Sequence, residues 1–446
     1  MRATGELAKA PGRLVVTVAA GQETAVAARS IPALPARIAA LTLLESALSR
    51  RGGLDEGLGA AALLGLTPQD RAFARALTMA ALRHLGPIDR ALDGRLKQEP
   101  PGQVRNILRL GAAQAFFLDT PAFAAVDTAV NLAPKPLRGL VNAVLRNLLR
   151  DGAIDAEPEQ LAPPWLFSRW RAAYGEAEAL AIAACIAKEP ATDLTLRGTP
   201  DEALVHALEA SPLPGGSLRS RLRGDVVSWP GYGDGRWWVQ DAAAALPARL
   251  MRARAGQSLA DLCAAPGGKS LQLAAAGAHV VAVDQSGGRL RRLTAGLART
   301  GLTAEIVTSD VLQWRDGRRF DGVLLDAPCT ATGAFRRNPD VLWNVRPGEI
   351  APLAAVQSRL LDTAAAKVRP GGLLVYAVCS LEPEEGEAQA QSFISAHSDF
   401  AIDPVAAGEC GAPIASGTAK GWLRVLPHHL EGGMDGFFIA RFRRDF

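Results

Sequence analysis

The stretch SLADLCAAPGGKSLQLAAAGAHVVAVD, residues 258–284, decides the fold of the C-terminal part of the chain. It contains a short apolar run, a turn of small residues, a helical pattern and a second short apolar run. This alternation of strand and helix is the repeating unit of a doubly wound, Rossmann-like α/β sheet. The strands that we predict from this pattern cover residues 259–262, 279–283, 304–308, 322–325 and 373–377, and a terminal hairpin covers residues 423–426 and 436–441.

Residues that directly follow a strand are the first candidates for a binding site, because ligands of such sheets bind beyond the carboxyl ends of the strands. The loop after the first strand is built of small residues before Lys269, which lets its backbone approach a ligand. Asp284 ends the second strand and can accept both hydroxyls of a ribose, and Asp310 after the third can hold an adenine amino group. These features predict a cofactor that contains adenosine. The predicted cofactor-binding residues are Cys263, Ala264, Ala265, Pro266, Gly267, Gly268, Lys269, Asp284, Asp310 and Asp326.

Two other ligands fit parts of this pattern. A nicotinamide dinucleotide binds to the same kind of sheet, so the fold alone does not exclude it. Residues 268–270 imitate the end of a phosphate-binding loop, although Cys263 stands where that loop requires its first glycine. Both ligands remain alternatives at this point.

Two cysteines and a carboxylate follow the fourth and fifth predicted strands. Asp326 and Cys329 belong to the sequence Asp-Ala-Pro-Cys, and Cys379 follows the fifth strand. Neighbouring strands lie about 4.8 Å apart, so we expect both thiols to face one pocket. One thiolate can add to an electron-poor carbon of a substrate, a carboxyl group can stabilise the adduct, and a second base can remove a proton. We predict Cys379, Asp326 and Cys329 as the catalytic residues that provide these three groups.

Composition and cysteine usage limit the class of protein. The chain has 446 residues, of which 48% are hydrophobic and 21% are charged, a balance typical of packed domains. Its five cysteines include no C-x-x-C pair, which argues against a disulfide framework and against structural zinc, so we expect no metal. We interpret Cys185 and Cys410 as buried apolar side chains. No apolar run is long enough to cross a membrane, and we expect a monomeric cytoplasmic protein without a membrane partner.

The N-terminal part has a different period and a different charge. Residues 31–150 have apolar residues at helical spacing, with Gly or Pro between the segments, which predicts a bundle of five to seven helices. They contain 15 Lys or Arg against 9 Asp or Glu, a local charge of +6, whereas the whole chain carries +4. This excess indicates either a polyanionic partner or an ordinary solvated surface. The residues that we predict to contact the phosphates of such a partner are Lys135, Arg138, Arg146, Arg150, Arg336 and Arg337.

Several motifs resemble one known family. Segments 70–73, 107–114, 125–130 and 142–146 resemble, in this order, the NusB-like RNA-binding domain, and the Asp326-to-Cys329 and Cys379-Ser380 motifs resemble the NOL1/NOP2/Sun RNA cytosine methyltransferases. Together they resemble the RsmB (Sun, Fmu) type of rRNA methyltransferase. The resemblance implies S-adenosylmethionine as the methyl donor, Cys379 as the nucleophile and Cys329 as the group that helps to release the product. The reverse roles, as in DNA cytosine methyltransferases, are the chemical alternative.

We therefore predict a multidomain enzyme that methylates carbon 5 of a cytosine in rRNA, with small-subunit rRNA as the expected substrate, through a covalent cysteine adduct. The predicted parts are a disordered tail (1–30), an all-α NusB-like RNA-binding bundle (31–150), a linker (151–163), a small α+β connector (164–236) and a class I methyltransferase domain (237–446). In the connector we expect helices at residues 165–187 and 201–210 and strands at 192–197 and 225–229. The alternatives are a tRNA cytosine methyltransferase, a non-catalytic NusB-like scaffold and a small-molecule methyltransferase.

Overall fold

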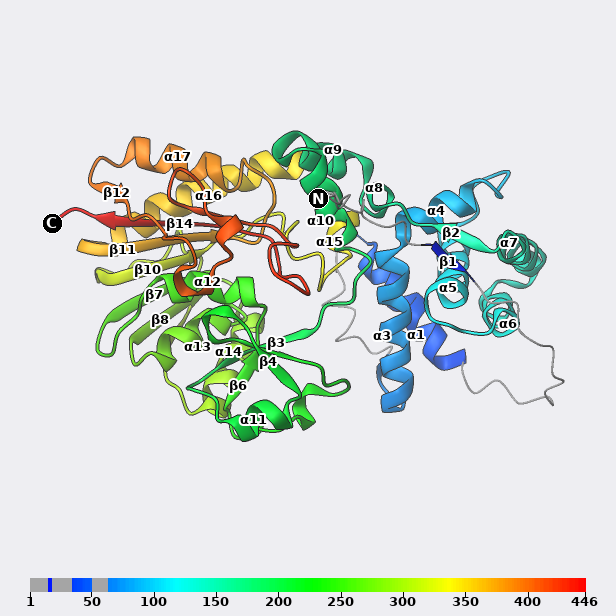
Figure 1. Cartoon of the computed structure of the whole chain (residues 1–446), viewed down its shortest axis with the longest axis horizontal. Helices are drawn as coiled ribbons and strands as arrows, with labels where there is room; N and C mark the ends of the chain where they lie inside the picture. The colour runs from blue at the N-terminus through cyan, green and yellow to red at the C-terminus, as the bar shows by residue number, and fades with distance from the viewer. Residues whose placement is uncertain (1–14, 18–33, 50–62) are drawn as a thin grey trace, which may run out of the picture. The chain divides into compact units, whose positions relative to one another are not determined.

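A computed structural model describes residues 15–17, 34–49 and 63–446. These residues form two compact units (Figure 1). The first is drawn from residues 1–188 and 342–344, and the second from residues 189–341 and 345–446. Within the described residues, no helix is long and apolar enough to span a lipid bilayer.

The first unit is a helical bundle in which α5 (Gly102–Phe117) is largely buried. Its Gly111 lies so close to α7 that an added Cβ would be 2.6 Å from Leu145 Cδ1. Thr67 caps α3 by accepting a hydrogen bond from Asp70 N–H. The described residues confirm the predicted bundle. Its helices are α1 (Leu34–Ala47), α3 (Pro68–Arg83), α4 (Leu85–Asp93), α5, α6 (Ala122–Leu132) and α7 (Arg138–Arg150).

The segments on either side of the bundle differ from the prediction. Val15–Thr17, within the tail predicted to be disordered, form strand β1 and pair with β2 (Ala153–Asp155) in the predicted linker. The rest of the predicted tail, residues 1–14 and 18–30, lies outside the described residues. The linker also contains α8 (Pro158–Leu161), which is ordered by burial of the Leu161 side chain.

The helix predicted at residues 165–187 is two helices. Gly175 has a φ of 89° and separates α9 (Pro164–Tyr174) from α10 (Glu176–Ala184), because a glycine in this conformation ends a helix. Both helices belong to the first unit, whereas we expected them in the connector.

The second unit begins with a small antiparallel sheet of strand order β4-β5-β3-β6. Buried leucine and tryptophan side chains form its core. The strand predicted at residues 225–229 is wrong, because Asp225 accepts a hydrogen bond from Val227 N–H and starts a 3-10 turn at Val226–Ser228. The strands of this sheet are β3 (Thr192–Leu196), β4 (Ala210–Pro212), β5 (Leu218–Ser220) and β6 (Trp237–Val239), and helix α11 (Glu202–Ala207) lies between β3 and β4 in the chain.

The rest of the second unit is an eight-stranded sheet with helices on both faces (Figure 1). Five strands are parallel in the order β11-β10-β7-β8-β9, and β14 and β12 continue the sheet in antiparallel pairing beyond β11. The predicted strands and the terminal hairpin are confirmed. The strands are β7 (Ser258–Leu262), β8 (His279–Asp284), β9 (Glu305–Thr308), β10 (Phe320–Asp326), β11 (Val368–Val378), β12 (Phe400–Ile402), β13 (Leu423–Val425) and β14 (Phe437–Arg444).

Successive residues of the central strands face opposite helical layers. Val323 of β10 shares a buried core with α16, and the next residue, Leu324, shares one with α12. The parallel register aligns Asp326 of β10 with Ala377 of β11, so the loops that follow these strands leave the sheet side by side. The helices of this part of the chain are α12 (Ala242–Leu250), α13 (Gly268–Ala275), α14 (Gly287–Thr300), α15 (Val341–Asn344), α16 (Pro347–Lys367) and α17 (Glu387–Ala396).

Candidate active site

The loop between β7 and α13 makes a tight turn at the carboxyl edge of the sheet. Gly267 has a φ of 113°, and an added Cβ there would lie 2.5 Å from Leu293 Cδ1, so this position requires glycine. Gly268 begins α13, whose first N–H groups have no partner within the helix. Cys263 lies in the same loop, where burial raises the pKa of its thiol and keeps it protonated. The loop therefore offers a ligand its backbone rather than a reactive thiol.

Asp284 is the last residue of β8 and Asp310 follows β9, as the sequence predicted. Asp284 is 3% exposed and accepts hydrogen bonds from Ala265 N–H (3.0 Å) and Ser286 N–H (2.8 Å). Its carboxylate therefore holds the loop after β7, while each oxygen keeps a second lone pair for a hydroxyl group. Asp310 accepts a hydrogen bond from Leu312 N–H (2.9 Å). Their contacts with ribose and adenine remain predictions.

A buried ion pair joins this loop to the Asp-Ala-Pro-Cys motif. Lys269 Nζ lies 2.7 Å from Asp326 Oδ2 and 5.4 Å from the centroid of the Phe437 ring. Burial lowers the pKa of Lys269, but the charges of Asp326 and Asp261 and the hydrogen bond to Asp326 outweigh it and raise that pKa above its ordinary value. Lys269 therefore stays charged although only 9% of the residue is exposed.

Asp261 on β7 is a second buried carboxylate, and it gives the fold a dependence on pH. Its Oδ2 accepts a hydrogen bond from Ser270 Oγ (2.5 Å), whereas its Oδ1 has no hydrogen-bond partner in the described part of the chain. Burial raises the pKa of Asp261 from 3.8 to about 7. The folded protein therefore keeps a proton that the unfolded chain releases, so stability falls as the pH rises from about 4 to about 7.

We expect Asp261→Asn to raise the melting temperature of the cofactor-free protein at pH 8 and to have a smaller effect at pH 5. The cost of an ionised Asp261 is on the order of a few kcal/mol, and each kcal/mol moves the melting temperature by about 2–4 °C. Thermal unfolding between pH 5 and 8 measures this difference. Asp234→Asn, at an exposed carboxylate, is the matched control. A melting-temperature difference that does not change with pH would contradict the prediction.

The two predicted catalytic cysteines face each other at the ends of β10 and β11. Cys329 Sγ lies 3.6 Å from Cys379 Sγ, and both residues are half-buried. The hydrogen bond to Cys379, burial, the charge of Cys379 and the charge of Glu385 raise the pKa of Cys329 well above its ordinary value. Cys329 is therefore held as a neutral thiol.

The surroundings of Cys379 are cationic instead. The pKa of Arg337 is raised, chiefly by Asp435, and the charge of Cys379 adds to this effect. Cys379 also contributes to the raised pKa of Lys269, after the stronger effect of Asp326. Two cations, Arg337 and Lys269, therefore lie within electrostatic reach of Cys379.

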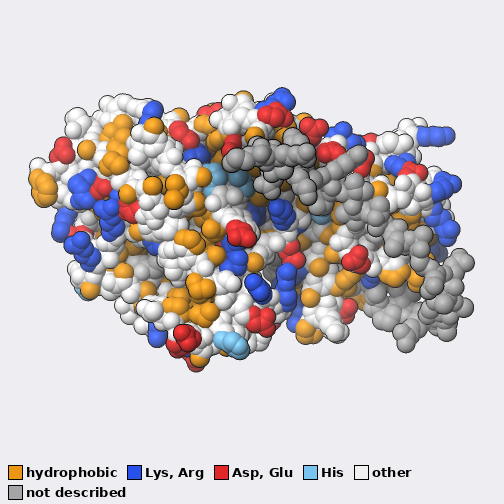
Figure 2. All heavy atoms as spheres, in the orientation of Figure 1, with side chains coloured by type: hydrophobic (Ala, Val, Ile, Leu, Met, Phe, Trp, Pro, Cys, Tyr) orange, Lys and Arg blue, Asp and Glu red, His pale blue; other side chains and the backbone are white. Residues whose placement is uncertain are grey.

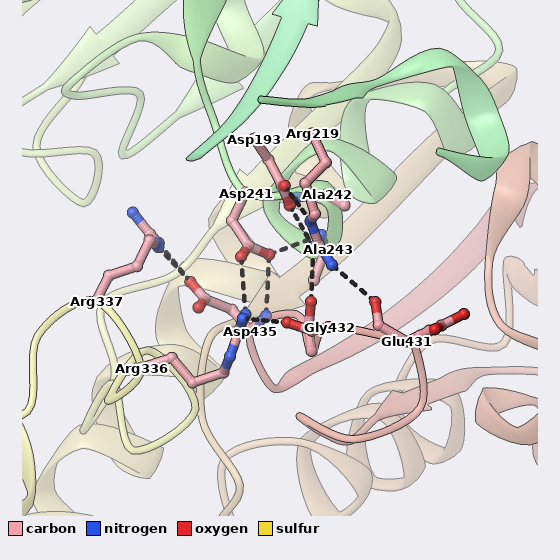
Figure 3. A network of polar contacts seen from close by, with 11 residues as sticks. Asp193, Arg219, Asp241, Ala242, Ala243, Arg336, Arg337, Glu431, Gly432 and Asp435 are labelled. Atoms are coloured by element: carbon pink, nitrogen blue, oxygen red, sulfur yellow. Dashed lines mark hydrogen bonds and ion pairs between the residues drawn. The ribbon is translucent and has the colours of Figure 1, made fainter. Parts of the chain in front are cut away.

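Arg336 and Arg337, both predicted to contact RNA, belong to a network of ion pairs (Figure 3). Arg336 is 3% exposed, lies 3.4 Å from Asp241 and donates a hydrogen bond to Gly432 O (3.0 Å). This burial corrects the prediction that Arg336 contacts RNA, because its guanidinium group is enclosed by protein. Arg337 Nε donates to Asp435 Oδ2 (2.9 Å), but 40% of its side chain is exposed and accessible to a phosphate.

The same network reaches the small sheet that precedes β7 and its loop (Figure 3). Arg219 on β5 pairs with Asp193 on β3 (2.7 Å) and donates a hydrogen bond to Gly433 O (2.6 Å). Asp241 accepts a hydrogen bond from Asp435 N–H (2.9 Å). These acids and arginines come from distant parts of the chain, so no sequence motif predicted that they form one network.

The predicted basic face of the first unit lies on α7 and the short turn before it. Lys135, Arg146 and Arg150 are exposed, and Arg138 is half-buried and donates to Ala133 O. In the described part of the chain, none of the four pairs with a carboxylate. Figure 2 shows Lys and Arg side chains gathered over α7 at the right-hand edge of the molecule.

The fold and the site together define a class of enzyme. A parallel sheet with a small-residue loop after its first strand, acids after the next two and a catalytic motif after the last two is the arrangement of a class I S-adenosylmethionine-dependent methyltransferase. The family model described as 16S rRNA methyltransferase RsmB/F matches residues 248–443, and the NusB family model matches residues 34–150.

Curated relatives match along most of the chain. It is 32% identical over 419 residues to the probable ribosomal RNA small subunit methyltransferase B of Synechocystis sp., which covers 85% of this chain and 92% of that protein. It is 34% identical over 434 residues to the ribosomal RNA small subunit methyltransferase B of Pseudomonas syringae pv. tomato, covering 91% and 96%. The chain belongs to the RsmB/F methyltransferase family, which confirms the resemblance found in its motifs.

Solved structures agree with this assignment. The structure of PH0851 has a TM-score of 0.75 at 23% identity and covers 93% of this chain and 100% of that one, which shows a shared fold. A methyltransferase homolog protein from Pyrococcus horikoshii has a TM-score of 0.54 at 26% identity and covers 63% of this chain and 95% of that one.

Proposed function

We propose that this enzyme methylates carbon 5 of a cytosine in small-subunit rRNA through a covalent bond between Cys379 and carbon 6. The observation that carries the proposal is the pair of thiols 3.6 Å apart beside the Lys269–Asp326 ion pair. The names of the curated relatives, ribosomal RNA small subunit methyltransferase B, support rRNA as the substrate. A target base that is paired in a helix must be flipped out to reach such a pocket.

In the first step, the Cys379 thiolate forms a bond to carbon 6, and the electrons of the ring double bond move towards carbon 5. Ring nitrogen 3 takes up a proton from the Lys269–Asp326 pair, and a carboxylate oxygen of Asp326 accepts a hydrogen bond from the exocyclic amino group. The ring thereby becomes an enamine, in which carbon 5 is a nucleophile. S-adenosylmethionine, when bound, supplies the electrophilic methyl group that carbon 5 accepts.

The residues around the loop after β7 suit such a donor. The backbone of residues 264–268 and the start of α13 can receive its amino-acid end, and Asp284 and Asp310 can receive ribose and adenine. Two cations at the loop are already engaged by protein groups: Lys269 is paired with Asp326, and Arg289 donates a hydrogen bond to Ala265 O. This donor set favours S-adenosylmethionine over a dinucleotide.

Product release requires loss of the carbon-5 proton. Once the Cys379 charge has been used in the bond to carbon 6, the hydrogen bond and the charge that raise the pKa of Cys329 are gone. Cys329 can then release its own proton to solvent and, as a thiolate, take the carbon-5 proton; the carbon–sulfur bond breaks, and its electron pair returns to Cys379. Ring nitrogen 3 returns its proton to the Lys269–Asp326 pair, so every group regains its starting state, and the proton released to solvent is the net proton of methyl transfer.

Transfer of labelled methyl groups tests the proposal directly. The protein is incubated with S-adenosylmethionine and, separately, with small-subunit rRNA, bulk tRNA and free cytidine, and the modified nucleoside is identified by mass spectrometry. We expect 5-methylcytidine in the rRNA only. Methylation of tRNA or of free cytidine would show that the substrate is a tRNA or a small molecule. A methyl group at another atom would exclude the covalent route.

We further propose that α7 contacts RNA phosphates, because Arg146 and Arg150 are exposed and neither pairs with a carboxylate among the residues that the structure describes. We expect Arg146→Gln with Arg150→Gln to weaken RNA binding roughly tenfold near physiological salt and to reduce the slope of log K against log salt by about 1–2. Binding titrations at several salt concentrations measure both effects. Arg171→Gln, at an exposed cation that faces Glu176 at 3.7 Å, is the control. Equal salt slopes for all variants would exclude α7 from the RNA interface.

A further inference from the structure

Glu385 is a buried carboxylate behind the two cysteines that no sequence motif had indicated. It lies six residues after Cys379, just before α17, and its side chain is fully buried. None of the steps proposed above uses it. A buried carboxylate is costly unless it is fully hydrogen-bonded, so its contacts indicate what it is for.

The Glu385 carboxylate joins the residues that directly follow the two cysteines. Its Oε1 accepts a hydrogen bond from Thr330 N–H (3.0 Å), and its Oε2 accepts one from Thr330 Oγ1. The same Oε2 accepts a hydrogen bond from Ser380 Oγ (2.5 Å). Thr330 follows Cys329 and Ser380 follows Cys379, so one side chain is bound to both cysteine loops.

Gln357 on α16 completes this arrangement. Its Nε2 donates to Glu385 Oε1 (3.0 Å) and to Pro328 O (2.9 Å). The residues before and after Cys329 are therefore both held, one by Gln357 and the other by Glu385. The carboxylate receives hydrogen bonds from neutral groups only, and no Lys or Arg pairs with it in the described part of the chain.

We propose that Glu385 is a positioning residue, whose carboxylate fixes the Cys329 and Cys379 loops at the spacing that the two-thiol chemistry needs. The proposal rests on the proposed function of this site. An error of about 1 Å in the placement of reacting groups costs about a hundredfold in rate, so a rigid link between the two loops has a large effect.

The charge of Glu385 has a second consequence. It contributes to the raised pKa of Cys329, after the hydrogen bond to Cys379, burial and the charge of Cys379. The other ionisable groups around Glu385 are Tyr376, whose hydroxyl donates to Glu385 O (2.5 Å), Arg424, which is paired with Glu387 (2.6 Å), and Glu382. None of these neutralises the carboxylate by direct contact.

The test separates the shape of Glu385 from its charge. Glu385→Gln keeps the shape and can keep every hydrogen bond, because the Thr330 and Ser380 hydroxyls can also accept. Glu385→Ala removes both the shape and the charge of the side chain. Glu384→Gln, at the exposed neighbouring carboxylate, is the matched control. Each protein is assayed for thermal unfolding, S-adenosylmethionine binding, covalent adduct with rRNA and methyl transfer as a function of pH. Iodoacetamide alkylation of Cys329, followed by peptide mass spectrometry across pH, needs no RNA.

We expect Glu385→Ala to slow adduct formation and methyl transfer at least about tenfold, while cofactor binding is kept. In Glu385→Gln, the pH midpoint for alkylation of Cys329 and the pH limb of methyl transfer should both move down by roughly one unit. If Glu385→Ala does not fold, the pH profiles of Glu385→Gln still test the proposal. Rates within about twofold of the wild type together with an unchanged alkylation profile would overturn the proposal. A wild-type protein that methylates no RNA would instead refute the proposed function. The alkylation profile of Cys329 would still test whether Glu385 acts on this thiol.

Discussion

We expect Cys379→Ala to abolish methyl transfer and covalent adduct formation and to leave cofactor binding and folding unchanged. The variant lacks the thiolate that makes carbon 5 nucleophilic, and Cys329 does not replace it, because its Sγ lies 3.6 Å from the position of Cys379 Sγ and an error of about 1 Å in the placement of a reacting atom costs about a hundredfold in rate. We expect a loss of at least about a thousandfold in the rate of methyl transfer to rRNA. Single-turnover transfer of labelled methyl groups, with calorimetric binding of S-adenosylmethionine, measures both quantities.

Cys410→Ala is the matched control for this variant. Cys410 is also half-buried, and its Sγ donates a weak hydrogen bond to Arg249 O (3.5 Å), so the substitution removes the same atom far from the proposed reaction. We expect wild-type activity from it. If Cys379→Ala kept its activity and Cys329→Ala lost it, the nucleophile would be Cys329 and the two roles would be reversed.

Cys329→Ala should accumulate a covalent enzyme–RNA adduct. Cys379 and the Lys269–Asp326 pair remain in place, so attack and methyl transfer proceed, but no base takes the carbon-5 proton and the carbon–sulfur bond is not broken. We expect one turnover at most, with most of the enzyme trapped. Denaturing gel electrophoresis after incubation with rRNA and S-adenosylmethionine should show a slowly migrating band that ribonuclease removes.

The double variant Cys329→Ala with Cys379→Ala identifies the attacking sulfur in that band. The band should disappear in the double variant and be weak or absent in the wild type. Continued multiple turnover by Cys329→Ala without a band would show that release does not depend on this thiol. Neither band nor turnover in Cys329→Ala would mean that Cys329 takes part in attack.

The C-terminal fold could be predicted because its information is local. Each strand of the parallel sheet is a short apolar run, and each candidate site residue ends its strand or follows it directly, so Asp284, Asp326 and Cys379 lie where the pattern placed them. The pairing of β10 with β11 then brings Cys329 and Cys379 to 3.6 Å. The predicted meeting of the two thiols needed only the strand order of a doubly wound sheet.

The connector was predicted less well because its elements are short. Its strands have three to five residues, too few for a period to appear, and the apolar residues at Val226 and Val227 resembled a strand although Asp225 turns the chain there. Gly175 divided a helix whose apolar spacing continued across it. Single residues with local backbone preferences outweighed the hydrophobic pattern at these places.

The sequence alone predicted the class of fold, the small-residue loop after β7 and the meeting of the two cysteines, since each depends on neighbouring residues or on a repeated strand–helix pattern. Only the tertiary structure decided which charged groups are buried and what they contact. It placed Arg336 against Asp241, 95 residues away, and Glu385 against Thr330, 55 residues away. The physical reason is that a carboxylate or guanidinium group is stable in the interior only with partners, and those partners come from chain segments that meet only after folding.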